Sequence, residues 1–216
     1  MPDLEILYED NHLLVVNKQA GIATMGSESG PTVHSLAADY LKRAYHKPGR
    51  AFVGIVSRLD TMTSGVLVLA RTSKAAKRLS EQFSGKSERS VEKYYIAAVD
   101  GVLDADSATW SDHVLKDDRA RRMRIVSDQA KGAQVATLRY HTVSDLDHQS
   151  VVLVRLLTGR KHQIRVQFAD RRHPVLGDRK YGSDASFPQG IALHSWRLQI
   201  MHPTKREPIS FEAPLP

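Results

Sequence analysis

The stretch FVGIVSRLDTMTSGVLVL, residues 52–69, places a mostly polar segment between two apolar runs. The apolar runs are short and rich in Val, Ile and Leu, which is typical of buried strands. Loops that emerge from a rigid sheet are where functional side chains gather. If the backbone of the polar segment is extended, Arg58 and Asp60 project to one side while Leu59 points into the core. This predicts a carboxylate and a guanidinium in one pocket, although an ordinary surface turn fits the spacing as well.

Two kinds of pattern flank this stretch. Residues 4–8 and 13–16 are aliphatic runs separated by an acidic turn, which predicts a β-hairpin. Residues 32–44 carry apolar side chains at the spacing of an amphipathic helix, with Thr32 as the N-cap. We expect Ser73 to cap a second helix that ends near residue 83.

The second half of the chain is mostly strand-like. The predicted strands are residues 94–99, 122–126, 133–143, 151–157, 193–200 and 208–212, and residues 162–169 predict a short helix. Successive strands separated by short turns favour antiparallel pairing. We therefore predict a mixed α/β (α+β) fold, with a largely antiparallel central sheet and flanking helices, as a single domain over residues 1–216. A Rossmann fold is not expected.

The composition excludes several function classes. At 216 residues with 41% hydrophobic residues, the chain is long enough for a packed core. It contains no cysteine, which excludes disulfides, a thiolate nucleophile and cysteine-based metal sites. No apolar run approaches the roughly 20 residues of a membrane-spanning helix, and the acidic N-terminus does not resemble a secretory signal. We expect a cytoplasmic protein.

The formal net charge of +7 favours a polyanionic partner, because basic surfaces attract nucleic acids. The basic residues gather in three clusters: Lys116, Arg119, Arg121, Arg122 and Arg124; Lys74, Lys77 and Arg78; and Arg171, Arg172, Arg179 and Lys180. Any one of these clusters also fits an ordinary solvated surface.

A second unusual segment is LTGRKHQIRV, residues 157–166, where a predicted strand ends in a basic, amide-rich turn. Arginine binds phosphate bidentately, and backbone N–H groups at a helix start add further donors. A solvated helix cap fits this segment equally well.

Several motifs, in order along the chain, carry a family resemblance. They are RLDTMTSG at residues 58–65, KYYIA at 93–97, TGRKHQIRV at 158–166, and HPVLGD at 173–178 with Tyr181-Gly182 after it. Together they resemble the RluA family of pseudouridine synthases, in its ribosomal large-subunit type without a separate N-terminal RNA-binding domain. Three residues depart from that pattern: Ser57 stands in place of the usual His, Gln19 in place of Pro, and Gln167 in place of His.

The resemblance implies an enzyme that isomerises specific uridines in structured RNA to pseudouridine. Asp60 is then the catalytic nucleophile, Arg165 the residue that pairs with this carboxylate, and Tyr95 the residue against the target base. The expected RNA-binding and base-binding residues are Arg58, Thr63, Ser64, Arg160, His162 and Gln163. Arg58 is expected to fill the space left by the flipped base. The implied partner is ribosomal or transfer RNA, the implied state is a monomer, and no cofactor or metal is implied.

Other functions fit the sequence less well. A non-catalytic RNA-binding module on the same fold would have no need of Asp60. A metal-dependent hydrolase is disfavoured because the ten histidines show no HExxH spacing, and a serine hydrolase built on Ser64 lacks a GxSxG elbow. Within the RluA reading, residues 25–31 and 104–123 are expected to encode the choice of uridine.

Overall fold

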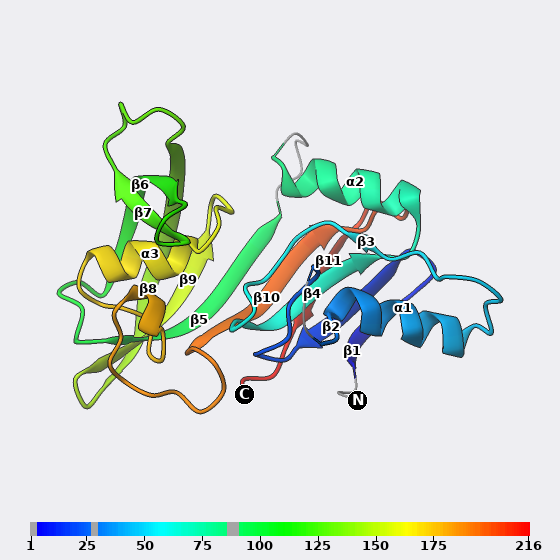
Figure 1. Cartoon of the computed structure of the whole chain (residues 1–216), viewed down its shortest axis with the longest axis horizontal. Coiled ribbons are helices and arrows are strands. Elements are labelled where there is room, and N and C mark those ends of the chain that lie inside the picture. Colours follow the sequence, from blue (N-terminus) through cyan, green and yellow to red (C-terminus); the bar gives the residue numbers. More distant parts are fainter. Residues whose placement is uncertain (1–3, 27–29, 86–90) are drawn as a thin grey trace. The chain divides into compact units, whose positions relative to one another are not determined.

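The computed structural model describes residues 4–26, 30–85 and 91–216 (Figure 1). These residues form two compact units. Unit 1 comprises residues 1–92 and 195–216, and unit 2 comprises residues 93–194.

Unit 1 is built on an antiparallel sheet. Its strand order is β1 (Glu5–Glu9), β2 (Leu13–Lys18), β4 (Ser64–Ala70) and β10 (Leu193–Met201), with β3 (Gly54–Ile55) paired to β4 and β11 (Pro208–Glu212) paired to β10. β2 and β4 pair along their whole length, so that Lys18 lies opposite Gly65. The register therefore brings the end of β2 beside the start of β4, where the polar loop ends.

Helices cover both faces of this sheet. Side chains alternate between faces along a strand, and Leu13 and Val15 pack in the cluster that contains α2 (Ser73–Phe83), whereas Leu14 and Val16 pack with α1 (Val33–Ala44). All residues of β2 are buried as a result. This explains why the strand reads as a continuous apolar run, which is typical of strands covered on two faces.

The predictions for unit 1 are mostly confirmed, with two corrections. The hairpin and the first helix form as expected, and Thr32 caps α1 by accepting a hydrogen bond from the Ser35 N–H. The second helix is capped by Thr72 and not by Ser73, because the Thr72 hydroxyl accepts from the Ala75 N–H. A strand was predicted over residues 52–56, but the observed strand β3 has only two residues, since only these pair with β4.

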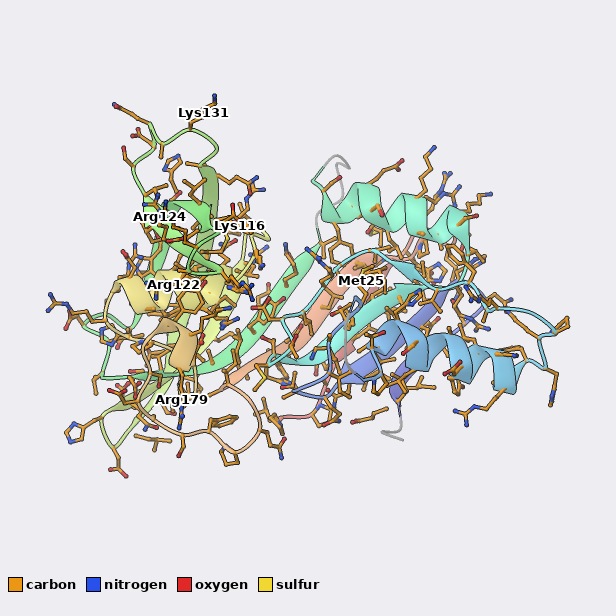
Figure 2. The ribbon with its side chains drawn as sticks, viewed as in Figure 1. Met25, Lys116, Arg122, Arg124, Lys131 and Arg179 are labelled. Atoms are coloured by element: carbon orange, nitrogen blue, oxygen red, sulfur yellow. The ribbon has the colours of Figure 1, made fainter. Side chains whose placement is uncertain are left out.

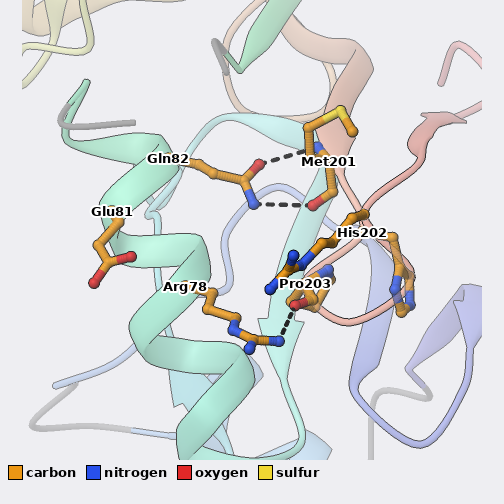
Figure 3. Close-up of a pocket in the computed structure, with 7 residues that line it drawn as sticks. Arg78, Glu81, Gln82, Met201, His202 and Pro203 are labelled. Carbon is orange, nitrogen blue, oxygen red and sulfur yellow. Dashed lines mark hydrogen bonds between the residues drawn. The ribbon is translucent and has the colours of Figure 1, made fainter. Parts of the chain in front are cut away.

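The C-terminal turn of α2 is fastened to the end of β10 by a side chain (Figure 3). The amide nitrogen of Gln82 donates to the Met201 carbonyl at 2.9 Å, and the Met201 N–H donates to the Gln82 amide oxygen at 3.0 Å. Arg78 donates to the Pro203 carbonyl at 2.6 Å. These side chains line a hollow of about 270 Å³, whose polar groups are largely used to hold the helix.

Unit 2 is also built on antiparallel strands. Its strand order is β5 (Glu92–Asp100), β9 (Gln149–Leu156), β8 (Gln134–Leu146), β6 (Ser107–Asp117) and β7 (Arg122–Val126). α3 (Gln163–Asp170) packs Phe168 into its core, and a 3₁₀ turn, η1 (Arg179–Tyr181), follows. The predicted strands are present within a few residues of their expected ends.

Strand β6 was not predicted from the sequence. It reads SATWSDHVLKD, and of its side chains only Val114 is fully buried. A strand so polar carries little hydrophobic alternation, and it forms because it pairs with both β8 and β7. The predicted fold class, a mixed α+β fold with a mostly antiparallel sheet, is confirmed. Among the described residues, no helix is long and apolar enough to cross a membrane.

Candidate active site

The polar loop between β3 and β4 ends in a tight turn at Asp60. The Thr63 N–H donates to the Asp60 carbonyl at 3.1 Å, and β4 begins at the next residue, Ser64. Thr63 is buried, whereas Asp60 and Ser64 are partly exposed. The Asp60 carboxylate thus lies on a short turn that directly precedes the buried strand β4.

Gly65 fixes how this turn enters the sheet. Its φ is +106°, and a Cβ at this position would lie 2.3 Å from the carbonyl oxygen of Ser195. A Cβ atom cannot lie so close to a carbonyl oxygen, and the positive φ is itself unfavourable for residues other than glycine. β4 therefore starts in close backbone contact with Ser195 of β10.

A buried lysine supports the turn from below. The Lys18 ammonium donates to the carbonyl oxygens of Gln19 at 2.9 Å, Ile22 at 2.8 Å and Thr61 at 3.0 Å, and its side chain is 1% exposed. Burial lowers the pKa of Lys18 to about 8, and the negative charge of Asp60 opposes that shift. The cation thus both ties down the residue after Asp60 and interacts with the Asp60 charge.

Three further hydrogen bonds hold the loop. The Thr24 hydroxyl donates to the Leu59 carbonyl at 3.0 Å and accepts from the Leu59 N–H at 3.3 Å, while the Gly21 N–H donates to the Thr61 carbonyl at 2.8 Å. Leu59 packs against the core cluster under α1, as predicted, and Arg58 is exposed. Hydrogen bonds therefore hold the main chain on both sides of Asp60, at Leu59 and at Thr61.

A hollow of about 530 Å³ opens beside this loop. It is lined by Met25, His34, Val53, Ile55, Val56, Ser57 and Arg58. The lining combines apolar side chains with a guanidinium and an imidazole, a composition common in ligand sites. Ser57, one of the three residues that depart from the family pattern, is part of this lining. The loop expected to choose the uridine, residues 25–31, falls partly outside the described residues.

In unit 2, Arg165 forms a buried ion pair with Asp178. Its Nε and Nη2 donate to the two carboxylate oxygens at 2.6 and 2.9 Å, and both side chains are almost fully buried. The guanidinium also lies 5.0 Å from the centre of the Tyr181 ring. Sequence reasoning did not place Asp178 among the site residues, although the HPVLGD motif contains it. Its role here is to hold Arg165 in one orientation.

His162 and Tyr95 are also held by their surroundings. His162 has a φ of +53° and its Nδ1 shares a hydrogen bond with the Tyr181 hydroxyl at 2.8 Å. That hydroxyl in turn accepts from the Met123 N–H at 2.9 Å. Tyr95, in β5 opposite Val154, is partly buried and packs against the core of unit 2.

Exposed basic side chains gather on one hairpin of unit 2. Lys116 of β6 and Arg122 and Arg124 of β7 are exposed, and Figure 2 labels them together with Lys131 in the turn after β7. Arg171, by contrast, is engaged internally, because it pairs with Asp112 at 3.0 Å and lies over the Trp110 ring. In the predicted cluster at residues 116–124 all the basic side chains are exposed, although Lys116 pairs with Asp118.

Residues 12–170 match the family described as RNA pseudouridylate synthase. The chain belongs to the RNA pseudouridylate synthase family. This confirms the family that the motifs at Asp60 and Arg165 predicted. A ribosomal large subunit pseudouridine synthase D of Xylella fastidiosa is 36% identical over 99% of this chain and 66% of its own length. An uncharacterized RNA pseudouridine synthase of Bacillus subtilis is also 36% identical, over 99% of this chain and 69% of its own length.

Solved structures of the same family share the fold. Human RNA pseudouridylate synthase domain containing 4 matches with a TM-score of 0.81 at 23% identity, covering 98% of this chain and 88% of its own. Human RNA pseudouridylate synthase domain containing 1 matches with a TM-score of 0.79 at 28% identity, covering 99% and 84%. This RNA pseudouridylate synthase chain spans about two thirds of the length of the curated relatives that it matches.

Proposed function

We propose that this chain isomerises specific uridines in structured RNA to pseudouridine, with Asp60 as the nucleophile. The observation that supports this most strongly is the turn at Asp60. It carries the family's RLDxxTSG motif, and the buried Lys18 ammonium holds its next residue, Thr61, at 3.0 Å. A carboxylate on a turn held this tightly has a defined direction of attack, which covalent catalysis requires.

The proposed reaction moves one glycosidic bond. The bond between N1 of uracil and C1′ of ribose breaks, the freed base turns in its pocket, and C5 bonds to the same C1′. The proton on C5 leaves and N1 gains one, so that the product is an isomer and no electrons or phosphoryl groups are transferred. Asp60 forms the transient covalent bond, either to C1′ or to the base, and both routes release the carboxylate again.

The other site residues keep the roles that the family resemblance implies. Arg58, exposed next to the catalytic turn, fills the gap left when the target nucleotide leaves its stack, a step that costs a few kcal/mol. Tyr95 contacts the uracil or takes part in removing the C5 proton. Arg165 keeps the catalytic carboxylate ionised, since a nearby opposite charge favours the charged form, and Asp178 orients Arg165.

The proposed substrate is ribosomal or transfer RNA. Thr63, Ser64, Arg160, His162 and Gln163 are proposed to contact the RNA or its flipped base, and the basic residues at 116–124 to contact phosphates. Phosphate contacts set affinity and salt dependence, not the choice of base. We further propose that both units form one catalytic domain, which acts as a cytoplasmic monomer without cofactor or metal.

Pseudouridine mapping of total RNA tests this function and names the substrate. Cells that lack the gene are complemented with the wild type, with Asp60→Asn, or with Asp39→Asn as a matched control at an exposed position of α1. We expect one or a few signals to disappear with the gene and to return with the wild type and Asp39→Asn only. If RNA binding persists but no signal depends on the gene, the chain is a non-catalytic RNA-binding module.

A further inference from the structure

Lys93, near the start of β5, carries a positive charge that the described residues do not neutralise. Its side chain is partly buried, and neither an acceptor nor a carboxylate among the described parts of the chain contacts its ammonium. Burial, and then the charge of Arg160, lower the pKa of Lys93. Removing an ammonium from water without a partner costs free energy. The fold therefore holds a partly desolvated cation at this position.

The position of this ammonium is set by the turn that follows β9. Lys93 lies opposite Leu156 in the β5–β9 register, so its side chain meets the chain where β9 ends. A Cβ on Gly159 would lie 3.2 Å from the Lys93 ammonium nitrogen, closer than most neighbours approach a Cβ. The glycine thus leaves room for the ammonium directly against the main chain of the turn.

Arg160 brings a second cation to the same turn. Its Nε donates to the Val135 carbonyl at 2.8 Å, which fixes the guanidinium at the start of β8. Arg160 is exposed, and its charge disfavours the charged form of Lys93. Two neighbouring cations of this kind repel each other in the free protein and are both stabilised by one bound anion.

Gln163 holds the main chain of the same turn. Its amide oxygen accepts from the Arg160 N–H at 3.0 Å and from the Thr158 hydroxyl at 2.7 Å. Because a main-chain N–H only donates, the atom it contacts has to be the amide oxygen, which fixes the orientation of the amide. The amide nitrogen is left buried without a hydrogen-bond partner among the described residues, and Gln163 is 3% exposed. The Gln163 side chain thus fixes, from inside the fold, the turn that carries Arg160.

We propose that Lys93 and Arg160, at the turn that contains Gly159, bind one backbone phosphate of the substrate RNA. This inference rests on the proposed function for its ligand, since an RNA enzyme meets phosphates at every nucleotide. The phosphate neutralises the two cations and accepts hydrogen bonds from them. It sets the register of the RNA strand and does not read its bases.

The test compares Lys93→Met with Lys42→Met, a matched control at an exposed lysine of α1. Binding of a fluorescein-labelled RNA stem-loop with unpaired uridines is followed by polarisation between about 50 and 200 mM KCl, the range over which phosphate contacts are strongly screened. For Lys93→Met we expect a Kd weakened about five- to tenfold at low salt. The slope of log K against log salt should fall in magnitude by about 0.7–0.9, the value for one phosphate.

The Tm of the RNA-free protein distinguishes a lysine that binds RNA from one that only stabilises the fold. If Lys93 serves the RNA, Lys93→Met keeps or raises the Tm of the RNA-free protein, and Lys93→Arg keeps the wild-type slope. A lower Tm with an unchanged slope would overturn the proposal. So would an unchanged slope with reduced turnover of bound RNA, which would place Lys93 at the base. If Lys93→Met lowers the slope but the wild type modifies no RNA, the phosphate site stands and the proposed reaction fails.

Discussion

The Lys18 ammonium donates a hydrogen bond at 3.0 Å to the carbonyl oxygen of Thr61, the residue that follows the proposed nucleophile Asp60. The same ammonium holds the carbonyls of Gln19 and Ile22. A single buried cation thus joins the end of β2, the segment after it and the catalytic turn. Burial lowers the pKa of Lys18 to about 8, so its charged form is disfavoured in this environment. The three hydrogen bonds to carbonyl oxygens offset that cost.

Lys18→Met should destabilise the fold and slow the reaction. The substitution leaves three carbonyl oxygens without their shared donor, which we expect to cost about 2–4 kcal/mol. The Tm, measured by calorimetry, should fall by roughly 5–15 °C for a chain of this size. Lys42→Met, at an exposed site, should change the Tm by less than about 2 °C. Equal effects of the two substitutions would contradict the supporting role of Lys18.

Gly65→Ala should be among the most destabilising single substitutions. The added Cβ would lie 2.3 Å from the Ser195 carbonyl oxygen, and the residue has a φ of +106°. We expect a loss of more than about 4 kcal/mol, or no folded protein. Gly49→Ala provides the comparison, because a Cβ there meets nothing within 4 Å. Circular dichroism and yield of soluble protein distinguish the two, and a stable, active Gly65→Ala would show that β4 and β10 are not in this contact.

Gln82→Ala should loosen the end of α2. Two hydrogen bonds to the main chain of Met201 are lost, and the Met201 groups are left without partners, at an expected cost of about 2–3 kcal/mol. Gln82→Met keeps the volume and loses the bonds, so it separates hydrogen bonding from packing. Denaturant unfolding measures both variants. If Gln82→Met were as stable as the wild type, the two Gln82 hydrogen bonds drawn in Figure 3 would contribute nothing.

Asp10 should make stability fall in acid. Burial alone would raise the pKa of Asp10, but hydrogen bonds from the His12 N–H, His202, the Leu13 N–H and Tyr8 together lower it to about 2. A carboxylate with a lowered pKa stabilises the fold above its ordinary value near 3.8, and this contribution is lost as the pH falls toward 2. Asp10→Asn should therefore lose less stability than the wild type between about pH 4 and 2 in Tm measurements. Parallel curves for the two proteins would exclude Asp10 as a source of the acid sensitivity.

Much of the fold could be predicted from the sequence because a hydrophobic pattern is a property of neighbouring residues in the chain. The covered strands β2 and β4 and the amphipathic helix α1 all bury what their sequence marks as apolar. Strand β6 was missed because it owes its existence to its partners β7 and β8 and not to its own side chains. Likewise Thr72, and not Ser73, caps α2, since the choice between adjacent cap residues depends on backbone geometry.

The site was predictable in its residue types and less so in its supports. The motif marked Asp60, but nothing local in the sequence shows that Lys18 reaches Thr61 across 43 residues of chain. Asp178 was similarly hidden, because its pairing with Arg165 arises only when η1 folds back on α3. In both cases long-range packing brings a charge to a partner that spacing alone does not reveal.

Tritium release from RNA tests the central claim most directly. Because C5 of uracil loses its proton when it bonds to C1′, RNA labelled with tritium at C5 of uridine releases tritium into water at each turnover. With the mapped substrate RNA, we expect release by the wild-type protein and none above background by Asp60→Asn, with both proteins binding the RNA equally. Release by Asp60→Asn at the wild-type rate would contradict the assignment of Asp60 as the nucleophile.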